Sequence, residues 1–243
     1  MQLEIIQECA QNFKELSDTT SYTFHTSLGK KISVFDVDFK PGDFHHAAGL
    51  QYLTDISIPR NVNKAIPWIL DKKKPITDDY LAKSKEYKGR ANQERDIELR
   101  ISELRFLKEY LDQENIVYIY SPKDSPRNNS IIPCNYIIKS HSSKRNQTVF
   151  IFLIHRAGKD SPCRIISFGV RKNVEYAGIY QYVMLKDKTI NGNRINVYRH
   201  PKYTDEQIVA NEPDVNADYL TLNKEEDWAT FIQTGNSFPL HMV

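Results

Sequence analysis

The sequence predicts an α+β protein whose second half forms an antiparallel β-sheet. Apolar residues recur at helical spacing near the N-terminus, and from residue 116 onward the pattern changes to a period of two. Polar, turn-forming residues separate the alternating segments. The chain has 243 residues, of which 40% are hydrophobic and 26% are charged. This length and composition allow a sizeable buried core.

Charge and cysteine content narrow the classes of function. The formal net charge of +2 gives no basis for whole-protein attraction to nucleic acid, so any such binding must come from a local patch. The three cysteines are too widely spaced for a metal site or a disulfide framework. The N-terminus lacks the features of a signal peptide, and no apolar run reaches membrane-spanning length. We therefore expect a cytoplasmic protein with no metal and no cofactor.

The first predicted elements are a helix and a strand pair. Apolar residues recur every three or four positions over residues 3–18, which is typical of one face of a helix. Residues 22–25 and 31–39 are rich in β-formers, and residues 27–30 between them have the composition of a hairpin turn. The N-terminal part therefore contributes both a helix and strands to the fold.

Further helices are predicted in the middle of the chain. A short helix is expected within residues 43–55, and prolines make residues 56–75 irregular. Thr77 is placed to cap another helix, with two aspartates in its first turn. The clearest apolar stripe spans residues 91–112. We interpret it as a helix packed on the sheet; a dimerising coil that would make a homodimer is the alternative.

Six strands are predicted in the second half. Residues 149–154 are apolar on both faces, which is typical of a central strand. Asn191 and Gly192 both tolerate positive φ and predict a hairpin turn. Beyond residue 203 only short helices at 205–210 and 224–233 are predicted. The six predicted strands are residues 116–120, 134–139, 149–154, 164–170, 180–185 and 194–198.

Two adjacent histidines are the first candidates for chemistry, because imidazole exchanges protons near neutral pH. The chain has no glycine-rich phosphate loop, no HExxH and no nucleophile elbow. His45 and His46 follow a predicted strand at the start of an apolar helix. Neighbouring side chains on a helix point about 100° apart, so at most one of the two faces a site. The alternative is that they cap the helix or pack in the core.

Ser167 is a second candidate. Strict alternation predicts that Ile165, Ser167 and Gly169 lie on one face of a strand. A serine beside a glycine leaves a shallow concavity in which a phosphate fits. The alternative is that the hydroxyl only bonds to a neighbouring strand.

Tyrosines and cations interleave near the end of the predicted sheet. Aromatic faces stack unpaired bases and cations neutralise phosphates, which is the physics of single-stranded RNA recognition. Tyrosine is also a favoured strand residue, so the signal has a purely structural alternative. The residues are Tyr176, Tyr180, Tyr182, Arg194, Tyr198, Arg199, His200, Lys202 and Tyr203.

Three stretches of the chain carry a family resemblance. The strand at residues 32–39 runs into residues 44–50, where F-H-H-A-A-G-L is similar to the family pattern F-x-H-L-x-G-L. The apolar strand 149–154 and the segment 162–168 follow in the family's order. The sequence resembles the phage-associated barnase–EndoU–colicin–RelE-like nuclease domains, fourth group, over roughly residues 5–200.

The resemblance implies N-terminal helices packed on a curved antiparallel β-sheet, with a site on the concave face of the sheet. It implies a nuclease-like domain over residues 1–203, with a helical insertion at about residues 56–112, and a C-terminal extension over residues 204–243. His46 takes the place of the family histidine, and Ser167 takes the place of the strand serine. The departures are Ala47 for leucine and Ala48 for a hydroxyl-bearing residue, which implies different packing beside His46.

The function that the resemblance implies is a metal-independent endoribonuclease of phage or mobile-element type, toxin-like, with RNA and an inhibitor protein as partners. Cleavage needs a base for the 2′-hydroxyl proton, a donor or cation at the phosphate and an acid for the leaving oxygen. We expect His46 to be the base or the acid and Ser167 to bond a phosphoryl oxygen. The remaining candidates are Tyr176 and Tyr180 for stacking or proton transfer, and His45, Lys139, Arg164 and Lys186 for substrate binding.

The competing hypothesis is a non-catalytic RNA-binding or protein-binding module on the same fold. A shared fold does not fix a shared activity. The departures from the family motif at Ala47 and Ala48 and the near-neutral total charge both favour this alternative.

Overall fold

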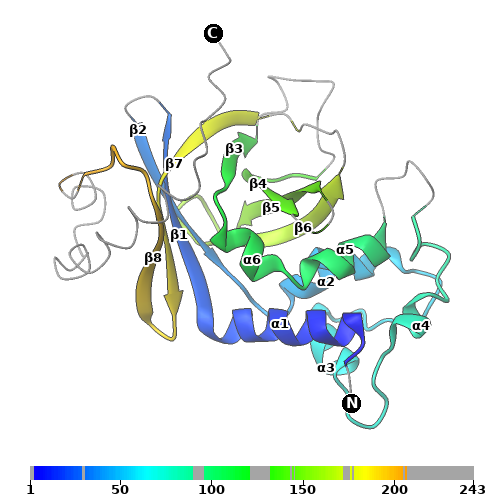
Figure 1. The fold of residues 1–243 in the computed structure, drawn as a ribbon. Helices are drawn as coiled ribbons and strands as arrows, with labels where there is room; N and C mark the ends of the chain where they lie inside the picture. Colours follow the sequence, from blue (N-terminus) through cyan, green and yellow to red (C-terminus); the bar gives the residue numbers. More distant parts are fainter. Residues whose placement is uncertain are drawn as a thin grey trace.

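A long N-terminal helix leads directly into an eight-stranded sheet (Figure 1). The computed structural model describes residues 3–28, 31–89, 96–120, 132–142, 144, 146–171, 176, 178–204 and 206. The predicted α+β class is confirmed. In the described residues no helix is long and apolar enough to cross a membrane. The helix predicted at 224–233, and that at 205–210 except for residue 206, lie outside the described residues.

Helix α1 (Ile5–Thr19) and its strand pair are confirmed. Glu4 and Gln7 form a reciprocal capping box at the start of α1, which satisfies backbone donors that the first turn leaves unpaired. The helix runs without a break into β1 (Thr20–Leu28), which pairs antiparallel with β2 (Lys31–Asp38) along its whole length. The predicted strand pair therefore forms, with β1 extending into the first two residues of the predicted turn; residues 29 and 30 lie outside the described residues.

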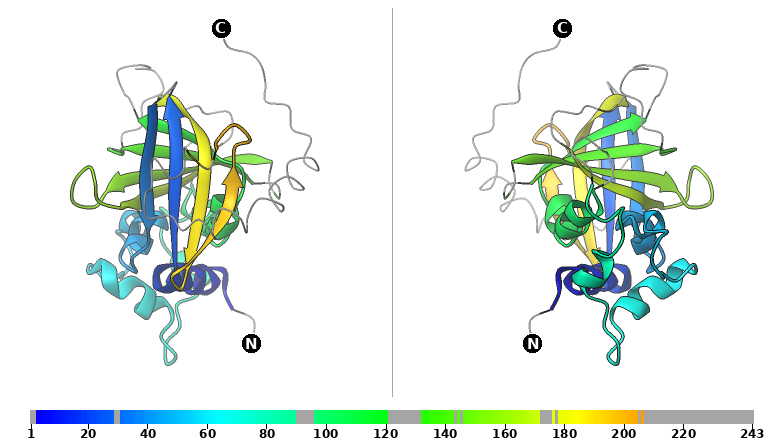
Figure 2. Two further views of the ribbon diagram at one scale, coloured as in Figure 1. Left: turned by 90° about the vertical axis from the view of Figure 1, so that its left-hand side faces the viewer. Right: turned by 90° about the vertical axis from the view of Figure 1, so that its right-hand side faces the viewer.

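The sheet curls back on itself and closes. Its strand order is β1-β2-β6-β5-β4-β3-β7-β8, and β1 also pairs with β7. Figure 2 shows β1, β2 and β7 running across the direction of β4, β5 and β6, with the helices gathered at one end. The six strands of the second half, each of which overlaps a predicted strand, are β3 (Ile116–Tyr120), β4 (Tyr136–Ser142), β5 (Gln147–His155), β6 (Cys163–Arg171), β7 (Gly178–Ile190) and β8 (Asn193–Arg199).

The sheet is mixed rather than purely antiparallel. Among the described strands, β2 and β6 form the one parallel pair, and a single pairing, Val37 opposite Cys163, joins them. Strand β7 is longer than predicted because it bonds to β3 near its start and to β8 near its end, while β1 runs along its other edge. Asn191 and Gly192 both have positive φ in the β7–β8 turn, as predicted.

The stripe at residues 91–112 is not one helix. Residues 91–95 lie outside the described residues, and the rest forms two helices that break at Arg105. At this break the guanidinium of Arg105 bonds to Glu8 on α1 at 2.9 Å and to the carbonyl of Ser102. The helices after β2 are α2 (Asp43–Ala47), α3 (Ala65–Ile69), α4 (Asp78–Leu81), α5 (Ile97–Leu104) and α6 (Leu107–Asp112), with 3-10 turns at Leu50–Tyr52 and Val62–Lys64.

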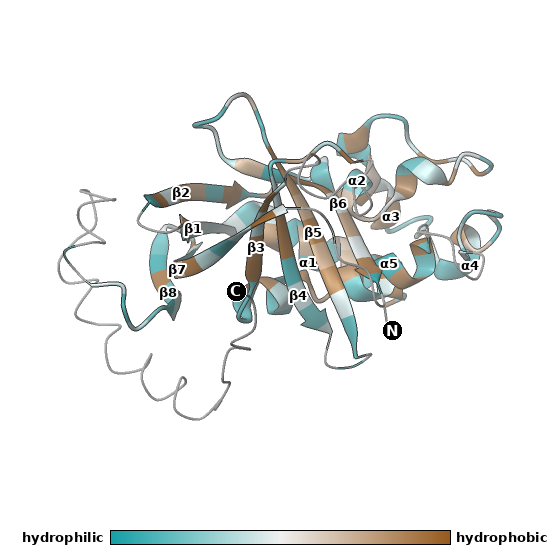
Figure 3. Cartoon of the chain, turned by 90° about the horizontal axis from the view of Figure 1, so that it is seen from above, coloured by the Kyte–Doolittle hydropathy of each residue, from teal (hydrophilic) through white to brown (hydrophobic). Residues whose placement is uncertain are grey.

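One face of β3–β6 packs on the helices, and we call it the helix face. Seen from above (Figure 3), these strands lie in front of α1 and α5. Aromatic side chains fill the space between the two parts of the sheet: Phe35 stacks on Phe24 at 5.1 Å and on Tyr136 at 4.1 Å between ring centroids. The opposite face of β3–β6, which we call the outer face, has its own apolar cluster around Ile137, Phe150 and Phe152.

The closure between β2 and β6 depends on Arg156. This arginine follows β5, and its guanidinium donates to the carboxylates of Asp38, at the end of β2, and of Asp43, at the start of α2. The side chain of Asp43 is 4% exposed and that of Arg156 is 14% exposed. Because the β2–β6 ladder has one pairing, this ion pair is the main polar connection across the seam.

Substitution of Arg156 by Met should lower the free energy of unfolding by about 3–5 kcal/mol, because Asp43 would keep a buried charge without its cation. Urea unfolding followed by circular dichroism measures the change. The double substitution Arg156→Met with Asp43→Asn removes that charge and should recover part of the loss. Equal stability of wild type and Arg156→Met would contradict the assigned role.

Lys186 is buried inside the sheet. It lies on β7 with 1% of its surface exposed, and its Nζ donates to the carbonyl of Gln113 and to Asn115 Oδ1. Burial lowers the pKa of Lys186 to about 7, and the nearby carboxylates of Asp112 and Glu114 oppose that shift. The lysine is therefore largely neutral in the folded protein at alkaline pH.

Stability should rise with pH because of Lys186. Between about pH 7 and pH 10 the unfolded chain holds a proton on this amine that the folded chain has lost, so deprotonation favours folding by up to about 1.4 kcal/mol per pH unit. The measurement is urea unfolding of wild type and Lys186→Met over this range. The free energy of unfolding of wild type minus that of Lys186→Met should increase with pH over this range and stay constant at lower pH. Parallel curves for the two proteins at every pH would refute the assignment.

Candidate functional site

Helix α2 lies along the edge of β6 where β2 departs. The chain leaves β2 at Asp38, and α2 then packs beside β6. Phe44 of α2 enters the core and packs against Phe13 of α1 with ring centroids 5.4 Å apart. Ala47 and Ala48 are completely buried, so the small residues that depart from the family pattern lie at a close contact. The helix is thereby fixed with its two histidines beside β6.

The sharp turn after α2 requires glycine. Gly49 has a φ of +76°, a conformation that glycine adopts without strain. A Cβ there would lie 2.7 Å from Cδ1 of Ile97 on α5. Leu50 then enters the core with 1% of its surface exposed. These contacts explain why the G-L of the motif follows the histidines.

His45 and His46 differ in exposure but share a direction of pKa shift. Their rings meet edge to face with centroids 5.4 Å apart. His45 is 7% exposed, and its buried Nδ1 has no hydrogen-bond partner. Burial lowers the pKa of both imidazoles. At His45, the charge of His46 lowers the pKa further. At His46, the charge of Arg164 lowers the pKa further and that of Asp43 raises it.

Arg164 on β6 supplies the positive charge beside His46. One of its terminal nitrogens lies 4.0 Å from a carboxylate oxygen of Asp43, while its Nε is buried without a hydrogen-bond partner. Its side chain is 43% exposed, so part of the guanidinium faces solvent. Asp43 and Arg156, which hold this arrangement, were not predicted as site residues; the only sequence signal was an acidic residue at the start of a helix.

A bulge in β6 changes the face on which Ser167 lies. Ile165 is opposite Leu153 of β5, and Ser167 is opposite Phe152, so Ile166 is an extra residue between them. The predicted placement of Ile165 and Ser167 on one face is therefore wrong. Ile165 packs in the helix-face core, and Ser167 lies on the outer face beside Phe152.

The same bulge puts Ser167 on the face of Arg164. Arg164 is opposite Ile154, two residues from Phe152 along β5, which corresponds to a Cα separation of about 7 Å along the sheet. Ser167 is 3% exposed, and its Oγ has no hydrogen-bond partner. Bulges often lie next to active sites, where they redirect side chains.

Among the described residues, the buried polar atoms without a hydrogen-bond partner include Nδ1 of His45 on α2, and Nε of Arg164 and Oγ of Ser167 on β6. A buried donor or acceptor without a partner costs about 1–3 kcal/mol. A ligand that completes the hydrogen bonds is one explanation for such groups on α2 and on β6, which are in contact with each other. Their chemistry, hydroxyl, guanidinium and imidazole, fits an anion.

Tyr176 and Lys139 lie on the same outer face. The ring of Tyr176 meets Phe150 and Phe152 edge to face, with centroids 4.8 and 5.1 Å apart. Since Phe152 is opposite Ser167, Tyr176 lies next to the serine's row of the sheet. Lys139 on β4 is opposite Phe150, one row further along.

The structure does not bring Tyr180 and Lys186 to this place. Tyr180 lies on β7, four strand spacings from β6 along the sheet, a path of about 19 Å. Lys186 faces the interior, where it bonds to Asn115. Both predictions rested on residue type and on sequence order. The strand order of the sheet separates Tyr180 from Ser167, and burial in the interior separates Lys186 from it.

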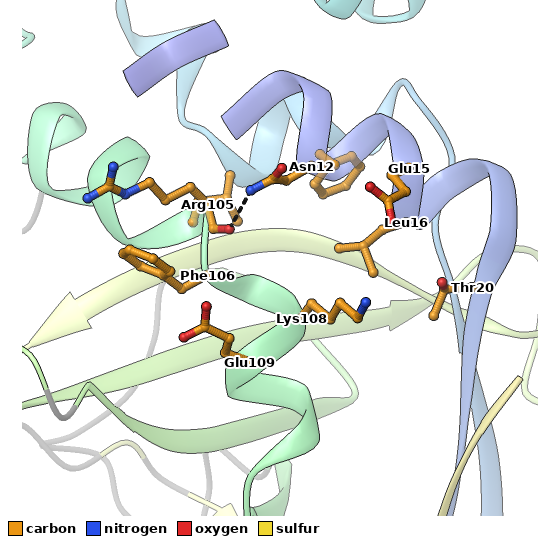
Figure 4. A pocket seen from close by; sticks show the side chains of 10 residues that line it. Asn12, Glu15, Leu16, Thr20, Arg105, Phe106, Lys108 and Glu109 are labelled. Carbon is orange, nitrogen blue, oxygen red and sulfur yellow. Dashed lines mark hydrogen bonds between the residues drawn. The ribbon is translucent and has the colours of Figure 1, made fainter. Parts of the chain in front are cut away.

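A pocket of about 210 Å³ lies elsewhere, between α1 and the break from α5 to α6 (Figure 4). The side chain of Asn12 bonds there to the carbonyl of Arg105 at 3.1 Å. Leu16, Phe106 and Lys108 also line it. It contains none of the predicted site residues. In the described part of the chain no group of three His, Cys, Asp or Glu side chains could hold a metal ion.

Comparison with protein families finds one that covers most of the chain. It is described as phage-Barnase-EndoU-ColicinE5/D-RelE like nuclease4, and it matches residues 5–208. No curated protein and no solved structure matches the chain. The match includes α2 with its histidines and β6 with Ser167. The chain belongs to this family and is a nuclease-like domain of the barnase, EndoU, colicin and RelE type.

Proposed function

We propose that this domain is an endoribonuclease that cleaves RNA without a metal ion, through attack of a 2′-hydroxyl on the adjacent phosphate. The observation that carries the proposal is the group of three buried polar atoms without partners, on His45, Arg164 and Ser167. One phosphate at this place would accept hydrogen bonds from the hydroxyl and the guanidinium. Its charge would also interact favourably with Arg164.

His46 is the proposed base. Its lowered pKa keeps the imidazole neutral near pH 7, in the form that accepts a proton. His46 takes the proton of the 2′-hydroxyl, the 2′-oxygen bonds to phosphorus, and the bond from phosphorus to the 5′-oxygen breaks. The products are a 2′,3′-cyclic phosphate and a 5′-hydroxyl. Arg164 and Ser167 stabilise the negative charge that grows on the phosphoryl oxygens.

Tyr176 and His45 complete the proposed site. The phenol of Tyr176, held over Phe152 beside Ser167, donates the proton that the leaving 5′-oxygen needs. His45 packs against His46 and keeps Nδ1 available for the substrate. Lys139 extends the positive charge along the outer face and attracts the next phosphate of the chain.

Replacement of His46 by Ala should lower the rate of RNA cleavage by about 10²–10⁴-fold, since a positioned proton carrier contributes that much. Purified protein is incubated with mixed RNA in EDTA, and 2′,3′-cyclic phosphate ends are measured. His200→Ala is the matched control, because His200 also has a pKa lowered by burial but lies beyond β8. Intact RNA that stays bound to wild type would instead support the binding module.

The pH dependence of cleavage should respond to Arg164. Activity needs neutral His46, so the rate rises with pH through a midpoint below 6.5 in wild type. Arg164→Gln removes a charge that lowers this pKa, so the midpoint should move to higher pH. Arg171→Gln, on the same strand, should leave the midpoint unchanged. Proton NMR titration of the His46 ring measures the same shift without substrate; no shift would refute the coupling.

A further inference from the structure

A row of side chains crosses five strands of the outer face and starts at Ser167. The pairing register places Ser167 of β6 opposite Phe152 of β5, and Phe152 opposite Ile137 of β4. Ile137 is in turn opposite Tyr118 of β3, and Tyr118 is opposite Tyr180 of β7. Residues that face one another in adjacent strands point to the same side of the sheet. The row therefore follows the curved sheet for about 19 Å, and its middle members, Phe152 and Ile137, are buried.

The chemistry changes along this row. Its first member is the buried hydroxyl of Ser167, with Arg164 two positions away on the same face. At its other end, Tyr118 and Tyr180 lie 6.0 Å apart, and Tyr180 and Tyr182 lie 4.8 Å apart between ring centroids. Tyr182 is 51% exposed. One end suits a phosphate, and the other presents aromatic rings to solvent.

Positive charge lies near the Ser167 end of the row. On the outer face, Lys139 of β4 lies in the row next to that of Ser167, and Arg171 of β6 lies one row further. Near the tyrosines, by contrast, the carboxylate of Glu114 is close enough to raise the pKa of Tyr180 further, after burial and Tyr182. A ligand held at the far end is therefore bound by ring contact rather than by charge.

We propose that Tyr118, Tyr180 and Tyr182 form a base-stacking subsite for the single-stranded RNA whose phosphate binds at Ser167. The proposal rests on the proposed function, because the position of the phosphate gives the strand its starting point. Stacking on aromatic rings tolerates any base and contributes about 1–3 kcal/mol per base. The tyrosines thus select unpaired nucleotides several positions away from the cleaved bond.

Binding of non-cleavable RNA tests the subsite without any cleavage. The probes are fluorescent 2′-O-methyl oligonucleotides, from a dinucleotide to an octamer, which lack the attacking hydroxyl. Tyr182→Leu should weaken octamer binding at least about fivefold and leave dinucleotide binding unchanged. Tyr182→Phe keeps the ring and should bind as wild type does. Tyr80→Leu, on α4, is the control for loss of a tyrosine elsewhere.

Salt dependence separates stacking from charge. The factor lost in Tyr182→Leu should be the same at low and high salt, whereas the factor lost in Arg164→Gln should shrink as salt rises. Octamer affinity that is equal in wild type and Tyr182→Leu, or that does not increase with length, would overturn the subsite. Cleavage that depends on His46 would then still support the proposed function, and Tyr182-dependent binding without cleavage would support the subsite alone.

Discussion

The arrangement of the site depends on one guanidinium. Arg156 joins the end of β2 to the start of α2 by bonding to Asp38 and Asp43, at the seam where β2 and β6 share a single pairing. This contact acts together with the buried Phe44, Ala47 and Ala48, which hold α2 beside β6 and His46 near Arg164. The ion pair is nearly buried, so solvent screens it little. Stability and the geometry of the site thus depend on the same contact.

Asp43 also sets the electrostatic balance at His46. It raises the pKa of that imidazole while Arg164 lowers it, so the two charges partly cancel and burial determines the direction. Asp43 is shared between Arg156 and Arg164, which leaves the Nε of Arg164 without a partner. An arginine held by a single shared carboxylate keeps donors for a substrate, and this is the feature that a phosphate-binding site needs.

Most of the secondary structure could be predicted from the sequence, because it follows from patterns within short segments. Helix α1, the β1–β2 hairpin and the strands of the second half follow from apolar periodicity and turn residues. The break at Arg105 could not, since the apolar stripe continues through it and its contact with Glu8 of α1 joins segments far apart in sequence. The burial of Lys186 could not be predicted either, because its hydrogen-bond partners lie on the segment between α6 and β3.

The candidate site was predictable only in part. Family resemblance pointed to His46 and Ser167, and residue type pointed to Arg164. Strict alternation, however, put Arg164 and Ser167 on opposite faces, and only the bulge at Ile166 unites them. A bulge is set by the register of the neighbouring strand, which one segment's sequence does not contain. The separation of Tyr180 from Ser167 likewise comes from the strand order.

The β2–β6 seam determines when the site can form during synthesis of the protein. Translation makes α2 early and β6 much later, so a growing chain carries the histidines well before the guanidinium and the hydroxyl that belong beside them. Long-range pairings of this kind form slowly, because the intervening loop must first be closed. If the domain cleaves RNA as proposed, the nascent chain on the ribosome has an incomplete site, and so does not cleave RNA, until β6 has emerged.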